Sequence, residues 1–304
     1  LGGKWYGGYY GWSWPHGFMN IIESLNIAAM NAVLMTGDMG YLDIPRGQLQ
    51  KMLELGRVEE GRLLMPHRYS DRGWTGYSPV EPSFLVPLWY ASQDDKDRKM
   101  IEAIPDCGTH WPAIDEDDAT HAGPWYSYIT GRNPDYPQQL LQQQLADVDE
   151  RIELAKHDEG DPSTWNVHHW QRRNPVRTTA LIQLTTGGPD PIYHGGLLHT
   201  RLRYYDPEAG RPGLPADTAA LVSGLDEESV TVDLVNANTE RSQSVRLQAG
   251  AFAEHEFTHA SEGEGEPTDP IGGTHVEVVL PAGGEVRLKL GMRRYCRRPT
   301  YDQP

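Results

Sequence analysis

The stretch FMNIIESLNIAAMNAVLMT, residues 18–36, decides the fold class. Apolar side chains lie on nearly every side of a helix built from this segment, and Gly37 follows where helices commonly end. A helix that is apolar all round is stable only inside a protein core. The sequence therefore predicts a buried helix over 18–36, with other helices packed around it.

Apolar and polar helical segments alternate along the first part of the chain. The expected helices cover 18–36, 41–55, 79–91, 95–104, 123–131, 137–157 and 174–186, and 62–78 is predicted as a loop. Buried helices that alternate with exposed ones describe an (α/α) toroid of helical hairpins. The hairpins are too few to close a toroid, and the chain starts with Leu1 in a motif-rich stretch. We therefore expect further hairpins before residue 1, or another chain that completes the ring.

The composition changes near residue 210. All 9 Trp lie at or before Trp170, and RPGLP at 211–215 has the composition of a linker. Apolar residues then alternate with polar ones in four predicted strands, at 229–237, 244–247, 275–280 and 285–290. The expected fold class is α+β and multidomain. It combines a partial (α/α) toroid over 1–210 with an antiparallel β-sandwich over 211–304.

Charge and cysteine content exclude several classes of protein. The net charge of −16 argues against nucleic acid as a partner. No apolar run is long enough to cross a membrane, and 2 Cys make no disulfide framework. The basic tail at 293–298 is expected to dock on the acidic body of its own chain. There is no phosphate-binding glycine motif, so no nucleotide cofactor is expected.

Aromatic rings gather in glycine-rich loops, first in KWYGGYYGWSWPHGF at 4–18. Pyranose rings have apolar faces that stack on Trp and Tyr, while polar groups pair with the hydroxyls. A saccharide platform is therefore one interpretation, and rings that only brace the loops are the other. The candidate substrate-binding residues are Trp5, Tyr6, Tyr9, Trp12, Trp14, His16, Trp74, Tyr77, Trp125, Trp170 and Arg173.

The densest group of polar residues is WNVHHWQRRNPVR at 165–177. Because Pro175 suits the first turn of a helix, Asn174 is the expected N-cap of the segment 174–186. In a toroid this loop and the segment around 193–201 would face the same mouth as 4–18. The candidate catalytic residues are His168, His169, Asn174, Arg177, Tyr193 and His194.

Two chemistries suit these residues. In β-elimination at a uronate, Arg, Asn or protonated His neutralises the carboxylate, and His and Tyr move the protons. Hydrolysis instead needs two carboxylates across the scissile bond, for which Asp71 and Glu81 are the candidates. Acidic residues are nearly absent from 4–18 and from 162–205. This absence favours elimination. Ion pairing of Asp71 and helix capping by Glu81 are the structural alternatives.

A metal site is not predicted. His110 and His121 flank an acidic run at 115–118 that could hold a structural divalent cation, but a solvated acidic loop is the favoured explanation. Neither an HExxH nor a CxxC motif occurs. No cofactor is therefore expected.

Paired helices with Trp/Tyr/His/Gly loops, followed by a Trp-free β-domain, resemble the toroid-plus-β-sandwich polysaccharide lyases and the six-hairpin (α/α) glycosidases. The resemblance is architectural. It implies a carbohydrate-active enzyme acting on a polysaccharide or oligosaccharide, in which Asn174 or Arg177 neutralises the carboxylate. It also implies proton transfer by His168 or His169 and by Tyr193, and an extracellular or periplasmic location. A glycoside hydrolase and a non-catalytic carbohydrate-binding protein are the alternatives.

Overall fold

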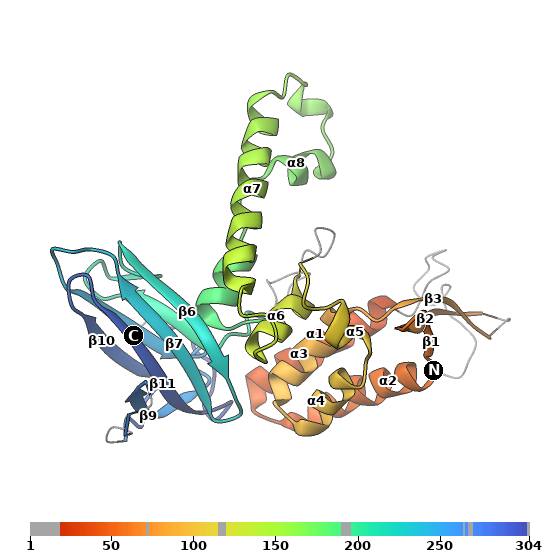
Figure 1. The fold of residues 1–304 in the computed structure, drawn as a ribbon, viewed down its shortest axis with the longest axis horizontal. Coiled ribbons are helices and arrows are strands. Elements are labelled where there is room, and N and C mark those ends of the chain that lie inside the picture. The colour runs from red at the N-terminus through yellow and green to blue at the C-terminus, as the bar shows by residue number, and fades with distance from the viewer. Residues whose placement is uncertain are drawn as a thin grey trace.

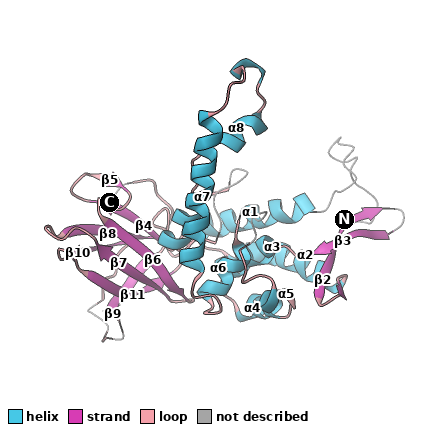
Figure 2. Ribbon diagram, turned by 45° about the horizontal axis from the view of Figure 1, so that its top comes forward, coloured by secondary structure: helices cyan, strands magenta, loops and turns pink. Residues whose placement is uncertain are grey.

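The computed structural model describes residues 19–70, 73–114, 120–189, 196–263, 265–266 and 270–302. The protein is α+β: an N-terminal helical region is followed by C-terminal antiparallel sheets (Figure 1). Figure 2 shows the same division by type of secondary structure, with a small separate sheet among the helices. The predicted order of a helical part and then a β part is confirmed.

The helical region contains most of the predicted helices, with ends shifted by a few residues. These are α1 (Met19–Thr36), η2 (Met39–Leu42), α2 (Asp43–Glu54), α3 (Pro82–Ser92), α4 (Asp95–Glu102), α5 (Asp106–Thr109), α6 (Ala122–Ile129), α7 (Tyr136–Lys156), η3 (Pro162–Thr164), α8 (Val167–Arg173) and η4 (Leu181–Thr185). The apolar segment that becomes α3 is buried along most of its length. It packs against α1 and α6 and forms the centre of this region.

Helix α1 ends as its sequence predicts. Val33 and Leu34 are buried, and Gly37 donates its N–H to the carbonyl of Val33 at 2.7 Å. Gly37 has a φ of +74°, a backbone conformation that is unfavourable for any residue with a Cβ atom. A Cβ at this position would also lie 2.4 Å from the carbonyl oxygen of Tyr295 in the C-terminal tail. The glycine therefore permits both the helix end and the contact with the tail.

We expect Gly37→Ala to lower the free energy of unfolding by about 1–3 kcal/mol, because it adds backbone strain and a steric overlap. Urea unfolding followed by circular dichroism measures this. Gly47→Ala is the matched control, since a Cβ at Gly47 meets nothing within 4 Å. Equal stability of the two variants would show that the Gly37 contact is unimportant.

The segment 62–78 is a hairpin, and its prediction as a loop is wrong. Strands β2 (Arg62–Ser70) and β3 (Gly73–Pro79) pair antiparallel, and β1 (Arg57–Glu59) pairs with β2. The buried carboxylate of Asp106 accepts hydrogen bonds from Arg62 Nε at 2.7 Å and from the N–H of Leu63 at 3.0 Å. This long-range anchor, which no local pattern encodes, fixes the hairpin to the helices.

The described helices do not close a toroid. Helix α7 leaves the body and α8 folds back beside it, so that together they form a projecting arm (Figure 1). Only Tyr136 and Leu140, at the start of α7, are buried. The rest of α7 is too polar to become an inner helix of a ring. The finer expectation, that these helices form part of a toroid, stays a prediction.

The expected helix over 174–186 is also wrong in its first half. Asn174 has extended backbone angles and terminates α8, and its side chain accepts from the N–H of Val176 at 3.0 Å. It is therefore not the N-cap of a following helix. A residue that precedes proline disfavours the helical region of backbone space, which accounts for the extended backbone of Asn174. Helix begins only at residue 179. The short helix η4 is a π-helix.

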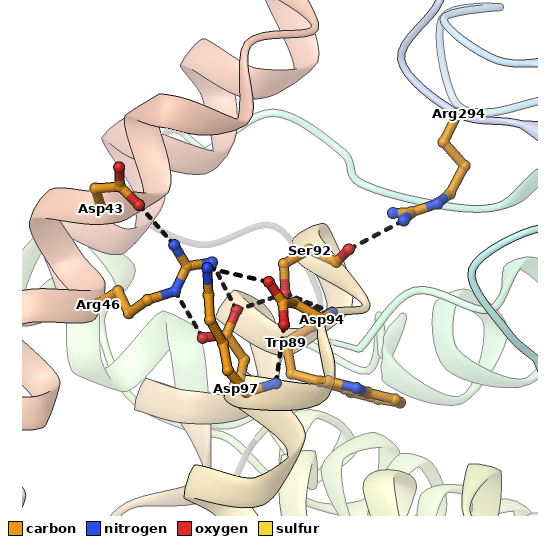
Figure 3. A network of polar contacts seen from close by, with 8 residues as sticks. Asp43, Arg46, Trp89, Ser92, Asp94, Asp97 and Arg294 are labelled. Atoms are coloured by element: carbon orange, nitrogen blue, oxygen red, sulfur yellow. Dashed lines mark hydrogen bonds and ion pairs between the residues drawn. The ribbon is translucent and has the colours of Figure 1, made fainter.

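A polar brace joins α2 to the end of α3 and the start of α4 (Figure 3). Arg46 on α2 donates from Nε and Nη2 to the carboxylate of Asp97 at 2.7 and 2.8 Å. Asp97 is buried and also accepts from Ser92 Oγ at 2.6 Å. The exposed Asp43 takes the remaining Nη1 of Arg46 at 2.7 Å. The paired buried charges hold the three helices in place.

The C-terminal region has two four-stranded antiparallel sheets, in the orders β10-β8-β4-β5 and β6-β7-β11-β9. Their strands are β4 (Leu202–Asp206), β5 (Arg211–Pro212), β6 (Thr218–Leu225), β7 (Ser229–Asn236), β8 (Gln243–Ala249), β9 (Glu256–Glu262), β10 (His275–Leu280) and β11 (Glu285–Arg293). Side chains from both sheets share one apolar core. All four predicted strands are present. The first strand, β4, lies before residue 211, and the segment expected as a linker contains β5.

The basic tail docks on its own chain, as predicted. Arg293 and Arg297 both pair with Glu256, at 2.8 and 2.5 Å. Arg294 donates to the carbonyls of Ala91 at 2.8 Å and Ser92 at 3.0 Å. The tail therefore ties the sheets to the C-terminal end of α3.

Candidate functional site

The candidate site lies where the sheets meet the C-terminal end of α3. The last carbonyls of a helix lack partners within the helix and carry partial negative charge. Arg201 Nη2 donates to the carbonyl of Tyr90 at 2.9 Å, beside the contacts of Arg294 with the next two carbonyls. Figure 3 shows Arg294 reaching Ser92. We use the name junction cluster for Tyr90, His199, Arg201, Glu254 and His255.

Arg201 is a buried cation with unused hydrogen-bonding capacity. Its exposed fraction is 0%, and its guanidinium lies 4.4 Å from the centre of the Tyr90 ring. Among the described residues, no carboxylate lies within ion-pair distance of Arg201, and its Nε and Nη1 have no hydrogen-bond partner. A buried charge is costly unless an anion and hydrogen-bond acceptors compensate it. Arg201 is thus suited to receive an anionic group.

His199 is neutral and presents a free acceptor nitrogen. Its Nε2 lies 3.1 Å from Oδ1 of Asn31, an atom that also accepts from the N–H of Leu197. Because that oxygen only accepts, we assign the ring proton to Nε2. Burial, and then the charge of Arg201, lower the pKa of His199 to about 4. Nδ1 therefore carries a lone pair, and it has no partner within the described part of the chain.

Glu254 and His255 complete the cluster. The Glu254 carboxylate accepts from the N–H groups of Phe252 and Ala251 at 2.7 and 3.3 Å, yet burial raises its pKa to about 7. His255 Nδ1 accepts from the N–H of Tyr295 at 2.9 Å, and its Nε2 lies 3.7 Å from Glu254. Burial holds the pKa of His255 well below its usual value. Perturbed groups gathered in this way are typical of functional sites.

The neutral state of His199 predicts a pH-dependent stability. Below pH 6.5 the unfolded chain protonates His199, whereas the folded chain does not until about pH 4. The unfolded state then binds more protons, so the contribution of His199 to the free energy of unfolding falls as pH falls through this window. His255 acts in the same direction. Glu254 acts in the opposite one, because its raised pKa costs stability as pH rises toward 7.

We expect His199→Gln to remove this contribution, on the order of 2 kcal/mol between pH 6.5 and 4. Urea unfolding of both proteins across that range measures the difference. The wild type should lose more stability on acidification than the variant. Parallel curves would show that His199 titrates alike in both states.

The structure places the predicted catalytic residues of 165–177 on the arm, away from the junction cluster. His169 and Arg173 both pair with Asp158, and Arg177 pairs with Asp147 at 2.6 Å. His168 is exposed on α8. The pairs with Asp158 tie α8 to the loop that follows α7, and the pair with Asp147 ties residue Arg177 to α7. The charges that we predicted would contact a substrate are therefore already paired within the arm.

The aromatic candidates divide into buried and accessible rings. Trp125 is fully buried in the core and cannot form a surface for a sugar. Arg57 covers the ring of Tyr77 at 3.9 Å, and Trp74 packs half-buried against the core. Trp170 is 52% exposed and touches Trp165 edge to face. Among the described candidate rings, Trp170 is thus the most accessible.

Several predicted residues lie outside the described residues: Trp5, Tyr6, Tyr9, Trp12, Trp14, His16, Asp71, Tyr193 and His194. Glu81 is the residue before α3, and no hydrogen bond from its side chain caps the helix. The carboxylate pair proposed for hydrolysis stays a prediction.

The sequence did not predict that the residues of the junction cluster lie together. Tyr90 is in an apolar helix, Arg201 precedes a strand, and Glu254 follows another strand. The signal that the sequence did offer was the triplet His199-Thr200-Arg201. The triplet places a His and an Arg directly before a strand, and in the structure Arg201 is fully buried, which is rare for this residue type.

Neither metal binding nor a membrane span is found in the part of the chain that the structure describes. There, no group of three or more His, Cys, Asp and Glu side chains could hold a metal ion. None of the described helices is both long and apolar enough to span a bilayer.

Comparison with known proteins gives a family. Residues 1–62 and 57–182 match the family described as "Domain of unknown function (DUF8034)", and the chain belongs to this family. No curated protein and no solved structure matches the chain. The family match includes Asn31 and Tyr90 but ends before His199 and Arg201.

Proposed function

We propose that the protein is a carbohydrate-active enzyme that cleaves a uronate-containing polysaccharide or oligosaccharide by β-elimination, and that the junction cluster is its site. The observation that carries the proposal is Arg201, a buried guanidinium without an ion-paired carboxylate among the described residues. A sugar carboxylate supplies the missing anion and accepts from the two unused N–H groups.

Arg201 would activate the substrate as well as bind it. The proton at C5 of a uronate is only weakly acidic, because removing it places negative charge next to a carboxylate. A cation on that carboxylate stabilises the enolate-like charge that develops. Because the site is buried, the interaction is stronger than it would be in water.

His199 is the base in this proposal. Its Nδ1 is unprotonated at neutral pH and, among the described residues, unpartnered. It takes the C5 proton, the C5–H electron pair forms the C4–C5 double bond, and the bond from C4 to the leaving oxygen breaks. Tyr193, which precedes His199 by six residues, remains the predicted donor of the proton that the leaving oxygen requires. His199 is half-buried, so it marks the side from which substrate would enter.

The proposal includes a toroid-plus-sandwich architecture and an extracellular or periplasmic location, which the resemblance to polysaccharide lyases implies. The alternatives are hydrolysis by Asp71 and Glu81 and sugar binding without turnover. The experiment below distinguishes these alternatives from elimination.

The test is to incubate the protein with polygalacturonate, alginate, chondroitin and neutral glucans while recording ultraviolet absorbance and reducing ends. Elimination predicts that both signals rise together with a uronate polymer, since the new double bond absorbs. Reducing ends without absorbance would mean hydrolysis. Binding of a polymer without either signal would mean a non-catalytic protein. If the protein neither bound nor cleaved any of these polymers, the proposal would be overturned.

A further inference from the structure

Helix α1 places one polar side chain beside the histidine of the junction cluster. Asn31 is half-buried on α1 and lies 168 positions before His199 in the chain. Its Oδ1 lies 3.1 Å from Nε2 of His199 and 3.2 Å from the backbone nitrogen of Leu197. One side chain of the helical region therefore contacts the segment that carries His199 at two points.

The contact with Leu197 fixes the direction in which the Asn31 amide points. A backbone N–H only donates, so the atom of Asn31 that faces it is the oxygen. The same oxygen faces Nε2 of His199, where it also only accepts. In a neutral imidazole one nitrogen carries the proton and the other carries the lone pair. The hydrogen bond to Asn31 thus assigns the proton to Nε2 and the lone pair to Nδ1.

We propose that Asn31 is a positioning residue, which holds His199 in the one tautomer and orientation that leave Nδ1 free to take the substrate proton. The inference rests on the proposed role of His199 as the base. A neutral histidine accepts a proton only through the nitrogen that lacks one, so the tautomer decides which nitrogen acts. Asn31 acts through the ring and needs no contact with substrate.

The charges around His199 explain why an amide suits this position. Arg201 faces the ring and, together with burial, keeps it neutral, and His255 also interacts with it electrostatically. A carboxylate at position 31 would instead stabilise the imidazolium form, and a protonated His199 could not accept a proton. The amide of Asn31 orients the ring without adding this charge.

Other contacts hold the backbone next to His199. The N–H of Arg201 donates to the carbonyl of Thr186 at 3.0 Å, and the carbonyl of Arg201 accepts from the N–H of Gly250 at 2.8 Å. These bonds do not involve Asn31. Loss of the Asn31 amide should therefore release the ring of His199 while the chain stays folded.

Nitrogen NMR of isotope-labelled histidine rings in the full chain tests the proposal without any substrate. The signals of His199 are assigned by their loss in His199→Gln. At neutral pH we expect a proton on Nε2 in the wild type and a mixture of both tautomers in Asn31→Leu, which has no acceptor. A wild-type ring protonated on Nδ1, or an unchanged ring in Asn31→Leu, would overturn the proposal.

Kinetics with a uronate polymer add a second readout. Asn31→Leu should lower kcat at least ~10-fold, because part of the His199 population presents the wrong nitrogen, and should leave KM unchanged. Asn31→Asp keeps the acceptor and hence the tautomer. Its carboxylate raises the pKa of His199, so the acid limb of the pH profile should move up by about 1 pH unit or more. An unmoved acid limb would contradict direct contact between residue 31 and the base.

Asn26→Leu is the matched control on the same helix. Asn26 is buried and donates from Nδ2 to the carbonyl of Phe84 at 2.7 Å. Its loss should lower stability but leave the tautomer of His199 and the pH profile as in the wild type. Equal effects of Asn26→Leu and Asn31→Leu on the ring would reduce Asn31 to a structural role. If no polymer is cleaved, the proposed function fails, and the NMR result alone decides whether Asn31 sets the tautomer.

Discussion

Turnover of a uronate polymer is expected to fall at least ~100-fold in the Arg201→Gln variant, because the charge that stabilises the developing enolate is gone. Gln keeps part of the side-chain volume and one donor for the carbonyl of Tyr90. The measurement is the initial rate of ultraviolet absorbance increase at saturating substrate, compared with the wild type.

Arg294→Gln is the matched control for this prediction. Arg294 is half-buried and donates to the carbonyls of Ala91 and Ser92, the two that follow the Tyr90 carbonyl capped by Arg201. Both variants therefore weaken the cap of α3, and both should lower the melting temperature. Only Arg201→Gln should abolish turnover. Equal loss of turnover in the two folded variants would show that Arg201 acts only as a helix cap.

The second large effect concerns the brace at Asp97. We expect Asp97→Asn to lower the free energy of unfolding by about 3 kcal/mol, because it leaves a largely buried Arg46 without its main anion. Urea unfolding measures the change. The bidentate geometry, with distances of 2.7 and 2.8 Å, makes Asp97 the dominant partner of Arg46.

Asp43→Asn provides the control for the brace. Asp43 contacts the same guanidinium at 2.7 Å, but its side chain is 75% exposed. Solvent screens such a pair, so the expected loss is below about 1 kcal/mol. If the two variants were equally stable, burial would not determine the strength of these contacts.

Periodicity in the sequence predicts those helices and strands whose buried face is visible in the local pattern of apolar residues. The all-round apolar segments gave α1, α3 and α6, and strict alternation gave the strands that include β7, β10 and β11. The arm could not be predicted in the same way. A polar helix of the same composition can cover a body or project from it, and contacts between distant residues decide which occurs.

The site was harder to predict than the fold. The densest polar run, at 165–177, is predicted to be catalytic because it gathers His, Arg and Asn side chains. In the structure its Arg and His side chains pair with Asp147 and Asp158, which lie just before the run and are brought back by the turn between α7 and α8. The junction cluster instead joins residues more than a hundred positions apart, and no local pattern links Tyr90 to Arg201 or Glu254.

The most direct test of the central claim is calorimetric titration with a short uronate oligosaccharide and with its methyl ester, which lacks the negative charge. If Arg201 receives the sugar carboxylate, the acid binds at least ~10-fold more tightly than the ester, and Arg201→Gln removes this difference. The same preference must persist in Arg294→Gln. Equal affinity of the wild type for acid and ester would contradict the assignment of Arg201 as the carboxylate-binding residue.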